Sequence, residues 1–461
     1  MKKLIYITAL AAAMSGSCSI YRNYERPDTE ELPVENLYSF ADSIADNTSS
    51  SNSLTLGDLP WQEMFTDPRL QELINYGLEN NTDMQVALLR LHQAQSQLTA
   101  ARLSFLPSVG FSPEVSVSKQ GSEAAAKSYT LPLSASWEID IFGSLRNAKQ
   151  GTQAAMLAQA AYSQAVRSQL IASLASGYFS LMALDEQISI SASTLDMWGE
   201  QVRTMEALMK VGEETENAVT QARASLYELE ADHNDLLRQR REAENALCTL
   251  LGTTARTIDR GTLANQQMPE ELNVGLPLRL LSKRPDVVQA EMTLAQAYYA
   301  TNVARAAFYP RLTLSGSAGW TDAIGNAVAN PGQWILQALA SLTQPIFNRG
   351  ELITGLRVAK DEEEIALLNY KQALLDAGQE VNDALYATQS ARRSLESHKR
   401  QCQELERSVT TAEALYRTGN ATYLELLTAR RSLLSARLNV VSDRLAALQA
   451  TVSLYQALGG N

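Results

Sequence analysis

The sequence predicts a mainly helical protein that also crosses a membrane with β-strands. Long segments without proline show helical periodicity, and two pairs of shorter segments alternate strictly between polar and apolar residues. The same motifs recur in the same order in both halves, at an offset of roughly 203 to 207 residues. We therefore expect a tandem repeat in which each half contains a helix, a β-hairpin, a long helix and a further helix.

The N-terminus indicates export. Two lysines precede the apolar stretch 4–14, and small residues lead from it to Cys18. This order is typical of a signal peptide, here 1–17, followed by a lipoprotein cleavage site, so Cys18 is expected to carry a covalent lipid. An ordinary signal peptide with an incidental cysteine is the alternative, because Ser15 stands where a bulky aliphatic residue is usual. The apolar stretch is too short for a transmembrane helix and no longer one follows, which leaves strands to enter a membrane.

Two segments lie outside the repeats. Residues 18–60 are rich in Ser, Asp, Glu and Asn and are expected to form an extended tether behind the lipid. Residues 255–284 contain several Pro and Gly and would link the first repeat, 61–254, to the second, 285–461. The formal net charge of −12 makes nucleic acid a poor candidate partner.

The hairpin of the first repeat is expected from strands at about 108–118 and 128–142. One face of each strand is apolar, and its length is close to the 9 to 11 residues that a tilted strand needs to span a bilayer. The opposite face is rich in serine and carries three carboxylates, which we expect to line an aqueous pore: Glu114, Glu138 and Asp140.

The second hairpin is expected from strands at about 311–320 and 334–347. Aromatic residues stand near the ends of the runs in both hairpins, as in the girdles of membrane barrels. The last run is the weakest, because Ile335 and Leu339 lie on its polar face. A half-buried strand of a soluble sheet gives the same alternation, so that interpretation stays open for each run taken alone.

The helices differ in length in a regular way. Residues 145–210 and 350–418 lack proline, and each would form a helix of roughly 100 Å. Shorter helices flank them at about 81–105, 215–251, 285–308 and 421–458. Each pair of short helices nearly equals the long one in length, so two stacked short helices could run beside one long helix in the wall of a cylinder. The linkers could pack as a belt where the short helices meet.

The sequence contains no pattern that indicates an enzyme. Neither GxxxxGK[ST], GxSxG nor HExxH occurs, and the three histidines lack the spacing of metal ligands. We expect no metal and no cofactor apart from the lipid. Cys248 and Cys402 could pair in an oxidising compartment or could be small buried residues of separate helices.

Four strands cannot close a barrel by themselves. An open edge in lipid would leave backbone groups without hydrogen bonds, at several kcal/mol each. Two copies would supply eight strands, about the size that side chains fill, whereas three copies would supply twelve and leave an aqueous bore. Three copies would also supply a helical cylinder that continues the barrel. The competing interpretation from another class is a lipid-anchored coiled-coil scaffold whose hairpins form a soluble sheet.

A set of short motifs resembles a known family. The set consists of the lipobox cysteine, Trp61...Phe65...Asp67-Pro68...Leu70, Trp137-Glu-Ile-Asp-Ile-Phe-Gly143, Arg284-Pro-Asp286, Ala304-Arg-Ala-Ala-Phe-Tyr-Pro310 and Gln344-Pro-Ile-Phe347. Together they resemble the TolC-like outer-membrane factors, specifically the NodT-type lipoproteins that serve RND efflux pumps. The resemblance implies a homotrimer with a 12-stranded outer-membrane barrel and a 12-helix periplasmic barrel. It also implies a passive duct that docks to a periplasmic adaptor and an inner-membrane RND transporter. An outer-membrane duct for type I protein secretion is the nearest alternative.

The family resemblance also assigns candidate residues at the periplasmic end. Leu424 matches the apolar constriction of the gate, and Glu425 falls where some members place a ring of acidic residues. Thr428 stands where many members carry aspartate, so a second carboxylate ring is missing. Gly212 and Gly419, at the turns between long and short helices, are placed as contacts for the adaptor. A solvated residue near a helix end is the alternative for Glu425, and helix capping is a further role of both glycines.

Overall fold

The chain forms two compact units, and each takes segments from both repeats. The computed structural model describes residues 21–27, 59–119, 121, 125–266, 283–323 and 333–460. We call the units the strand unit, which comprises residues 1–32, 90–160 and 289–372, and the turn unit, which comprises residues 33–89, 161–288 and 373–461. The two repeats are therefore not two separate domains, because the long helix of each repeat passes through both units.

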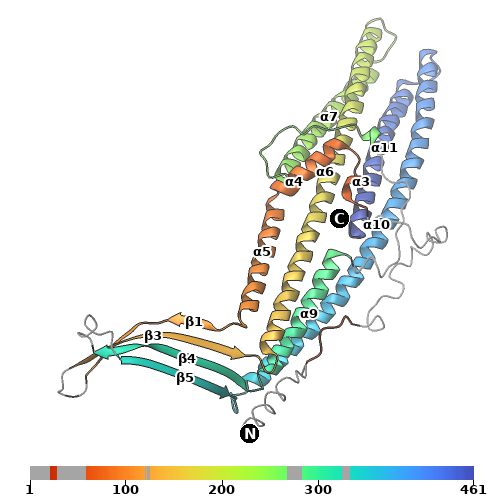
Figure 1. The fold of residues 1–461 in the computed structure, drawn as a ribbon. Helices are drawn as coiled ribbons and strands as arrows, with labels where there is room; N and C mark the ends of the chain where they lie inside the picture. The colour runs from red at the N-terminus through yellow and green to blue at the C-terminus, as the bar shows by residue number, and fades with distance from the viewer. Residues whose placement is uncertain are drawn as a thin grey trace. The chain divides into compact units, whose positions relative to one another are not determined.

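The strand unit contains one antiparallel sheet (Figure 1). Its strands are β1 (Ser108–Phe111), β2 (Glu114–Ser118), β3 (Ala126–Ile139), β4 (Arg311–Ala323) and β5 (Gln333–Thr343). Both β1 and β2 pair with β3, which pairs with β4, and β4 pairs with β5. The two hairpins are thus joined side by side through β3 and β4. Among the described residues, no strand pairs with the outer side of β1, β2 or β5.

The first expected strand is interrupted. The prediction of one continuous strand over 108–118 is wrong at Ser112 and Pro113, which lie between β1 and β2. Proline has no amide hydrogen to donate to a neighbouring strand. The register is nevertheless the same on both sides of the gap, because Phe111 pairs with Leu133 and Glu114 with Thr130. β1 and β2 therefore run in the same direction and keep one register with β3. Only Ser112 and Pro113 lack strand pairing.

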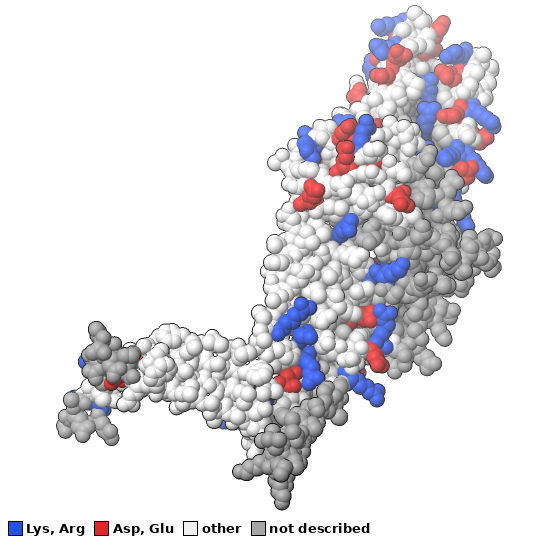
Figure 2. All heavy atoms as spheres, in the orientation of Figure 1, with Lys and Arg blue, Asp and Glu red and all other residues white. Residues whose placement is uncertain are grey.

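The two faces of the sheet differ in chemistry. The apolar face is open to the surroundings: Val109 is 65% exposed, Trp334 74% and Leu336 83%. On the opposite face, hydroxyl groups bond across strands, as Ser116 does with Ser128 at 2.8 Å. The face shown in Figure 2 carries almost no charged side chain along the strands. An uncharged apolar surface of this extent favours a sheet that faces lipid.

The helices of the strand unit match the expected ranges to within a few residues. They are α9 (Pro285–Ala306), the end of α5 (Thr82–Leu103) and the beginnings of α6 (Ser144–Lys210) and α10 (Glu351–Arg417). Inside the unit, the Thr301 hydroxyl donates to the Ala359 carbonyl at 3.0 Å and ties α9 to α10. The N-terminal segment 21–27 packs on α9, where Arg26 donates two hydrogen bonds to Glu291, at 2.8 and 2.5 Å.

The turn unit holds the largest core. Its further helices are α3 (Trp61–Met64), α4 (Pro68–Asn80), α7 (Glu216–Leu250), the 3-10 turn η3 (Leu263–Asn265) and α11 (Tyr423–Ala457). The sequence analysis did not anticipate α4, although Asp67 caps its first turn and Pro68 occupies the first helical position. The core contains fully buried side chains from α3, α4, α6, α7 and α11, among them Met64, Ile74, Leu174, Leu247 and Leu454. No helix in the described part of the chain is long and apolar enough to cross a membrane.

Candidate functional site

Two of the three predicted pore carboxylates lie on the polar face of the sheet. Glu114 is in β2 opposite Thr130, and Glu138 is in β3 opposite Thr313. Serine and threonine hydroxyl groups surround both positions along the face. The lining of a pore by these two carboxylates remains a prediction, and their position on the hydrophilic face is consistent with it.

The third carboxylate, Asp140, has a different role. The strand that was expected to run to residue 142 ends at Ile139, so Asp140 lies in the connection to α6. Its side chain is 7% exposed and accepts hydrogen bonds from the backbone N–H groups of Leu145 and Arg146, at 3.1 and 2.8 Å. These amides belong to the first turn of α6, which lacks internal acceptors for them. The Asp140 carboxylate therefore caps α6, and its lining of the pore remains an untested prediction.

Gly212 and Gly419 end the long helices in the same way. Both adopt left-handed backbone angles, with φ of 83° and 72°. In each turn the next amide bonds back to the helix: Glu213 N–H donates to the Leu208 carbonyl, and Asn420 N–H donates to the Leu415 carbonyl, both at 2.9 Å. This is the usual glycine cap of a helix end. Apart from the adjoining residues, no atom of the described chain lies within 4 Å of the position of a Cβ at either glycine, so each turn has space beside it.

The first two turns of α11 contain the three predicted gate residues. Glu425 accepts a hydrogen bond from the Thr422 backbone N–H at 2.8 Å, and the Thr422 side chain accepts one from the Glu425 N–H at 3.4 Å. Glu425 is thus the acidic partner of a capping box and is also exposed. Leu424 is 57% exposed, and the Thr428 hydroxyl donates to the Leu424 carbonyl at 2.7 Å. The corresponding position of the first repeat is Ala218, so the chain carries this carboxylate once.

A contact that the sequence analysis missed joins the two turns. The Tyr416 hydroxyl, at the end of α10, donates to the Glu214 carboxylate in the turn between α6 and α7. Burial and the Glu214 carboxylate raise the pKa of Tyr416, so the hydroxyl keeps its proton. The Tyr423 ring stands edge-on to Tyr416, with 6.1 Å between the centroids. Neither residue belongs to a motif, and the partners are 202 positions apart, so no local pattern indicates the pair.

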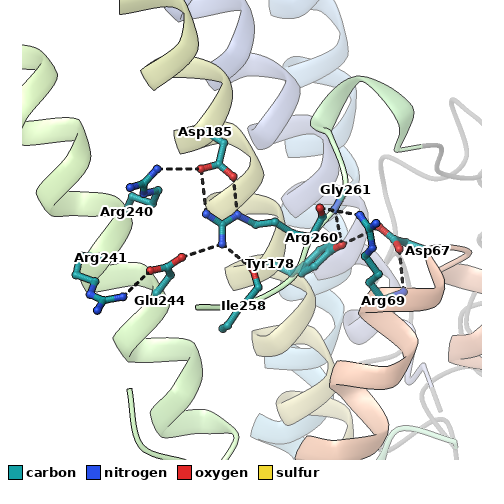
Figure 3. A network of polar contacts seen from close by, with 10 residues as sticks. All are labelled: Asp67, Arg69, Tyr178, Asp185, Arg240, Arg241, Glu244, Ile258, Arg260 and Gly261. Carbon is teal, nitrogen blue, oxygen red and sulfur yellow. Dashed lines mark hydrogen bonds and ion pairs between the residues drawn. The ribbon is translucent and has the colours of Figure 1, made fainter. Parts of the chain in front are cut away.

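Arg260, in the linker between the repeats, forms the most connected ion-pair network of the turn unit (Figure 3). Its guanidinium donates to both oxygens of Asp185 on α6, at 2.5 and 3.0 Å, and to Glu244 on α7 at 2.9 Å. The side chains of Arg260 and Glu244 are 11% and 5% exposed. A single linker residue therefore holds the first long helix and the short helix beside it.

A second contact fixes the same stretch of linker to α4 and α6. The Tyr178 hydroxyl donates to Asp67 at 2.8 Å and accepts a hydrogen bond from the Gly261 N–H at 3.1 Å (Figure 3). Arg69 also donates to the Arg260 carbonyl, at 2.7 Å. Residues 260 and 261 of the linker are thus bound to α4 and α6, and the packing of the linker as a belt remains a prediction. The remainder of the linker, 267–282, lies outside the described residues.

The cysteines and acidic residues form no metal site in the described part of the chain. Cys248 is a buried free thiol whose sulfur accepts a hydrogen bond from the Arg256 N–H at 3.4 Å, and Cys402 is also free. The two cysteines therefore do not pair. Cys18, the predicted site of lipidation, lies outside the described residues.

Comparison with known proteins shows the family of the chain. The family model described as "Outer membrane efflux protein" matches residues 73–253 and 276–460. The toluene efflux pump outer membrane protein TtgC of Pseudomonas putida is 30% identical, over 82% of this chain and 79% of TtgC. The probable outer membrane lipoprotein SilC of Salmonella typhimurium is 27% identical, over 81% of this chain and 80% of SilC.

Solved structures show the same fold. The open state of the Neisseria gonorrhoeae MtrE outer membrane channel superimposes with a TM-score of 0.85 and 29% identity, covering 96% of this chain and 98% of MtrE. The chain belongs to the outer membrane efflux protein family, and it is an outer-membrane efflux channel.

Proposed function

We propose that three copies of the chain form a passive exit duct through the outer membrane. The observation that carries this proposal is the sheet, which exposes an apolar face and ends in two edges without a partner strand among the described residues. Backbone groups at such edges need hydrogen-bond partners inside a bilayer, and another copy of the chain supplies them. Three copies are preferred over two because a barrel of twelve strands leaves room for water, whereas one of eight is filled by side chains.

The polar face of the sheet would then line the bore. Its hydroxyl groups, together with Glu114 and Glu138, give a hydrophilic wall through which cargo passes without a chemical step. No enzymatic role is part of the proposal. The energy for transport comes from an inner-membrane RND transporter, which also selects the cargo.

We further propose that a lipid on Cys18 anchors the N-terminus in the outer membrane. The relative SilC is named an outer membrane lipoprotein, and the layout of residues 1–18 here is that of a lipoprotein signal. The docking of segment 21–27 on α9 supports the proposal, because this segment follows Cys18 by three residues in the sequence and is bound to the strand unit.

The partner at the other end would be a periplasmic adaptor. The turns at Gly212 and Gly419 are suited to this contact, because each is open and has the same backbone geometry. The relative TtgC is named as a component of a toluene efflux pump, which supports assembly with a pump. Because both turns have the same backbone geometry, an adaptor could contact the two repeats through equivalent surfaces.

Reconstitution tests the duct directly. Purified full-length protein is expected to require detergent, to have the mass of three chains in native mass spectrometry, and to give stepwise conductance in planar bilayers. Protein that stays monodisperse without detergent and gives no conductance would contradict the proposal. If the conducting species is a dimer, the proposal of a duct stands and the proposal of three copies is wrong.

Replacement of Glu425 by glutamine tests its part in the gate. Glutamine also serves in a capping box, so Glu425→Gln removes the negative charge and retains the cap on α11. We expect reduced preference for cations or a changed open probability in single-channel recordings, because neighbouring carboxylates attract counter-cations. Glu404→Gln, an exposed charge on α10, is the control for net charge. Identical recordings from both variants would remove Glu425 from the gate.

A further inference from the structure

A small cavity in the strand unit lies where β3 passes into α6. Its volume is about 130 Å³, which equals the liquid volume of about four water molecules and accommodates a phosphate group. The walls come from the junction 141–143, the first turns of α6, Tyr299 of α9 and the N-terminal residues 21–23. The N-terminal segment and the strand–helix junction therefore build this cavity together.

Hydrogen bonds on both sides hold the N-terminal wall in place. The Tyr298 hydroxyl donates to the Arg22 carbonyl at 3.1 Å. Four residues further on, Arg26 forms its two hydrogen bonds with Glu291, whose side chain is only 7% exposed. Loss of Arg26 would leave this buried carboxylate without its ion-pair partner, so the pair ties the segment to α9. The backbone of Arg22 is thus fixed at the edge of the cavity.

The cavity is lined by donors of hydrogen bonds and by positive charge. Arg22 and Arg146 both line it, together with the amide side chains of Asn23 and Gln150. Asn147 also lines it, but its amide donates to the Gly143 carbonyl at 2.7 Å. The Arg22 guanidinium has no ion pair with any residue that the structure describes. The Arg146 Nε atom lies 3.5 Å from the Asp140 carboxylate, which also caps α6. The two guanidinium groups of Arg22 and Arg146 and the carboxylate of Asp140 together have a net charge of one positive unit. A monoanion would neutralise this charge.

The position of the cavity indicates which kind of anion it binds. Directly beside it, Ile141 is 40% exposed and the Phe142 ring stacks on Tyr309, with 4.9 Å between the centroids. This junction marks the end of the strands in an outer-membrane channel, so it lies at the level of the lipid headgroups. Aromatic and basic side chains gather at that level in membrane proteins. Phosphate groups of phospholipids are concentrated there, whereas free phosphate is not.

We propose that this cavity binds the phosphodiester group of a phospholipid in the inner leaflet of the outer membrane. Arg22 and Arg146 donate charge-assisted hydrogen bonds to the phosphate oxygens, and the guanidinium geometry permits two bonds from one side chain. The acyl chains extend from the cavity past Ile141 into the bilayer. The bound lipid thereby fixes the depth of the strand–helix junction in the membrane, which is a role beyond that of the proposed duct.

Titration with a defined lipid tests the site. Purified full-length protein in mixed detergent micelles is titrated with phosphatidylglycerol, and bound lipids are counted by native mass spectrometry. We expect saturable binding that Arg22→Gln weakens about tenfold, the effect of losing charge-assisted hydrogen bonds. Arg357→Gln, which removes an exposed charge from α10 outside the cavity, is the matched control and is expected to bind as the unmodified protein does.

Three results would overturn the assignment. Equal affinity of Arg22→Gln and Arg357→Gln would show that the cavity does not hold the phosphate. Equally tight binding of diacylglycerol would show that acyl chains alone account for retention, and equally tight binding of inorganic phosphate would identify a free-anion site. Conductance of the unmodified protein is recorded separately, so loss of the lipid site and loss of the duct are distinguishable.

Discussion

Replacement of Gly319 by alanine is expected to prevent assembly of the membrane-inserted sheet. A Cβ at this position would lie 2.3 Å from the Leu131 carbonyl oxygen and 2.8 Å from the Pro132 Cα. Both atoms belong to the backbone of β3, so no side-chain rotation relieves the overlap and the strands themselves must separate. Overpacking in a well-packed site costs about 1–3 kcal/mol, and occasionally more, even when side chains can move. We expect outer-membrane fractions to contain little assembled protein, measured by sedimentation and semi-native electrophoresis.

The sheet provides its own control for this experiment. In β1, a Cβ at Gly110 would lie 3.7 Å from the Ser134 Oγ atom, which is an ordinary contact. Gly110→Ala is therefore expected to assemble as the unmodified protein does. Normal assembly of Gly319→Ala would mean that β3 and β4 are further apart than the structure has them. Failure of both variants would mean that any added methyl group in the sheet is harmful.

Loss of the Arg260 side chain is expected to have the largest effect on the stability of the turn unit. Arg260→Ala would leave the Glu244 carboxylate, which is 5% exposed, without its most buried partner and would remove both hydrogen bonds from Arg260 to Asp185. Removal of one partner from a buried ion pair costs about 3–5 kcal/mol, and the exposed Arg241 would neutralise the remaining Glu244 charge only in part. Denaturant unfolding followed by the helical circular dichroism signal measures the change in free energy.

Arg241 is a matched control, because it binds the same carboxylate from the surface. Its side chain is 60% exposed and donates to the other Glu244 oxygen at 3.1 Å. Exposed ion pairs contribute about 0–1 kcal/mol, so Arg241→Ala is expected to change stability little. Equal losses in the two variants would show that burial does not distinguish the pairs. If Arg260→Ala unfolds like the unmodified protein, the linker is not what joins α6 to α7.

Much of the fold was predictable because its signals are local. The long helices lack proline, and their ends at Gly212 and Gly419 are marked by residues that tolerate left-handed angles. The hairpins follow from alternation, which depends only on neighbouring positions. The gap at Pro113 could have been anticipated from the missing amide hydrogen, whereas the helix-capping role of Asp140 required knowledge of where β3 ends.

The contacts between distant residues inside the turn unit were not predictable in the same way. Arg260 meets Asp185 across 75 positions, and Tyr416 meets Glu214 across 202. Single arginine, tyrosine and glutamate residues occur throughout the chain, and nothing in their neighbourhood distinguishes these from the others. The division into units was missed for a related reason. The repeat can be read from the order of motifs in the sequence. The division into compact units depends on which parts of the long helices lie near which short helices.

The pairing of β3 with β4 has a consequence for the symmetry of the duct. This seam joins a strand of the first repeat to a strand of the second, and the free edges, β1 with β2 on one side and β5 on the other, again come from different repeats. In the proposed trimer, every boundary between two hairpins therefore joins a first-repeat hairpin to a second-repeat hairpin. Boundaries inside one chain alternate with boundaries between two chains. The barrel is thus a ring of six related hairpins. Two neighbouring hairpins belong to the same polypeptide at every second boundary.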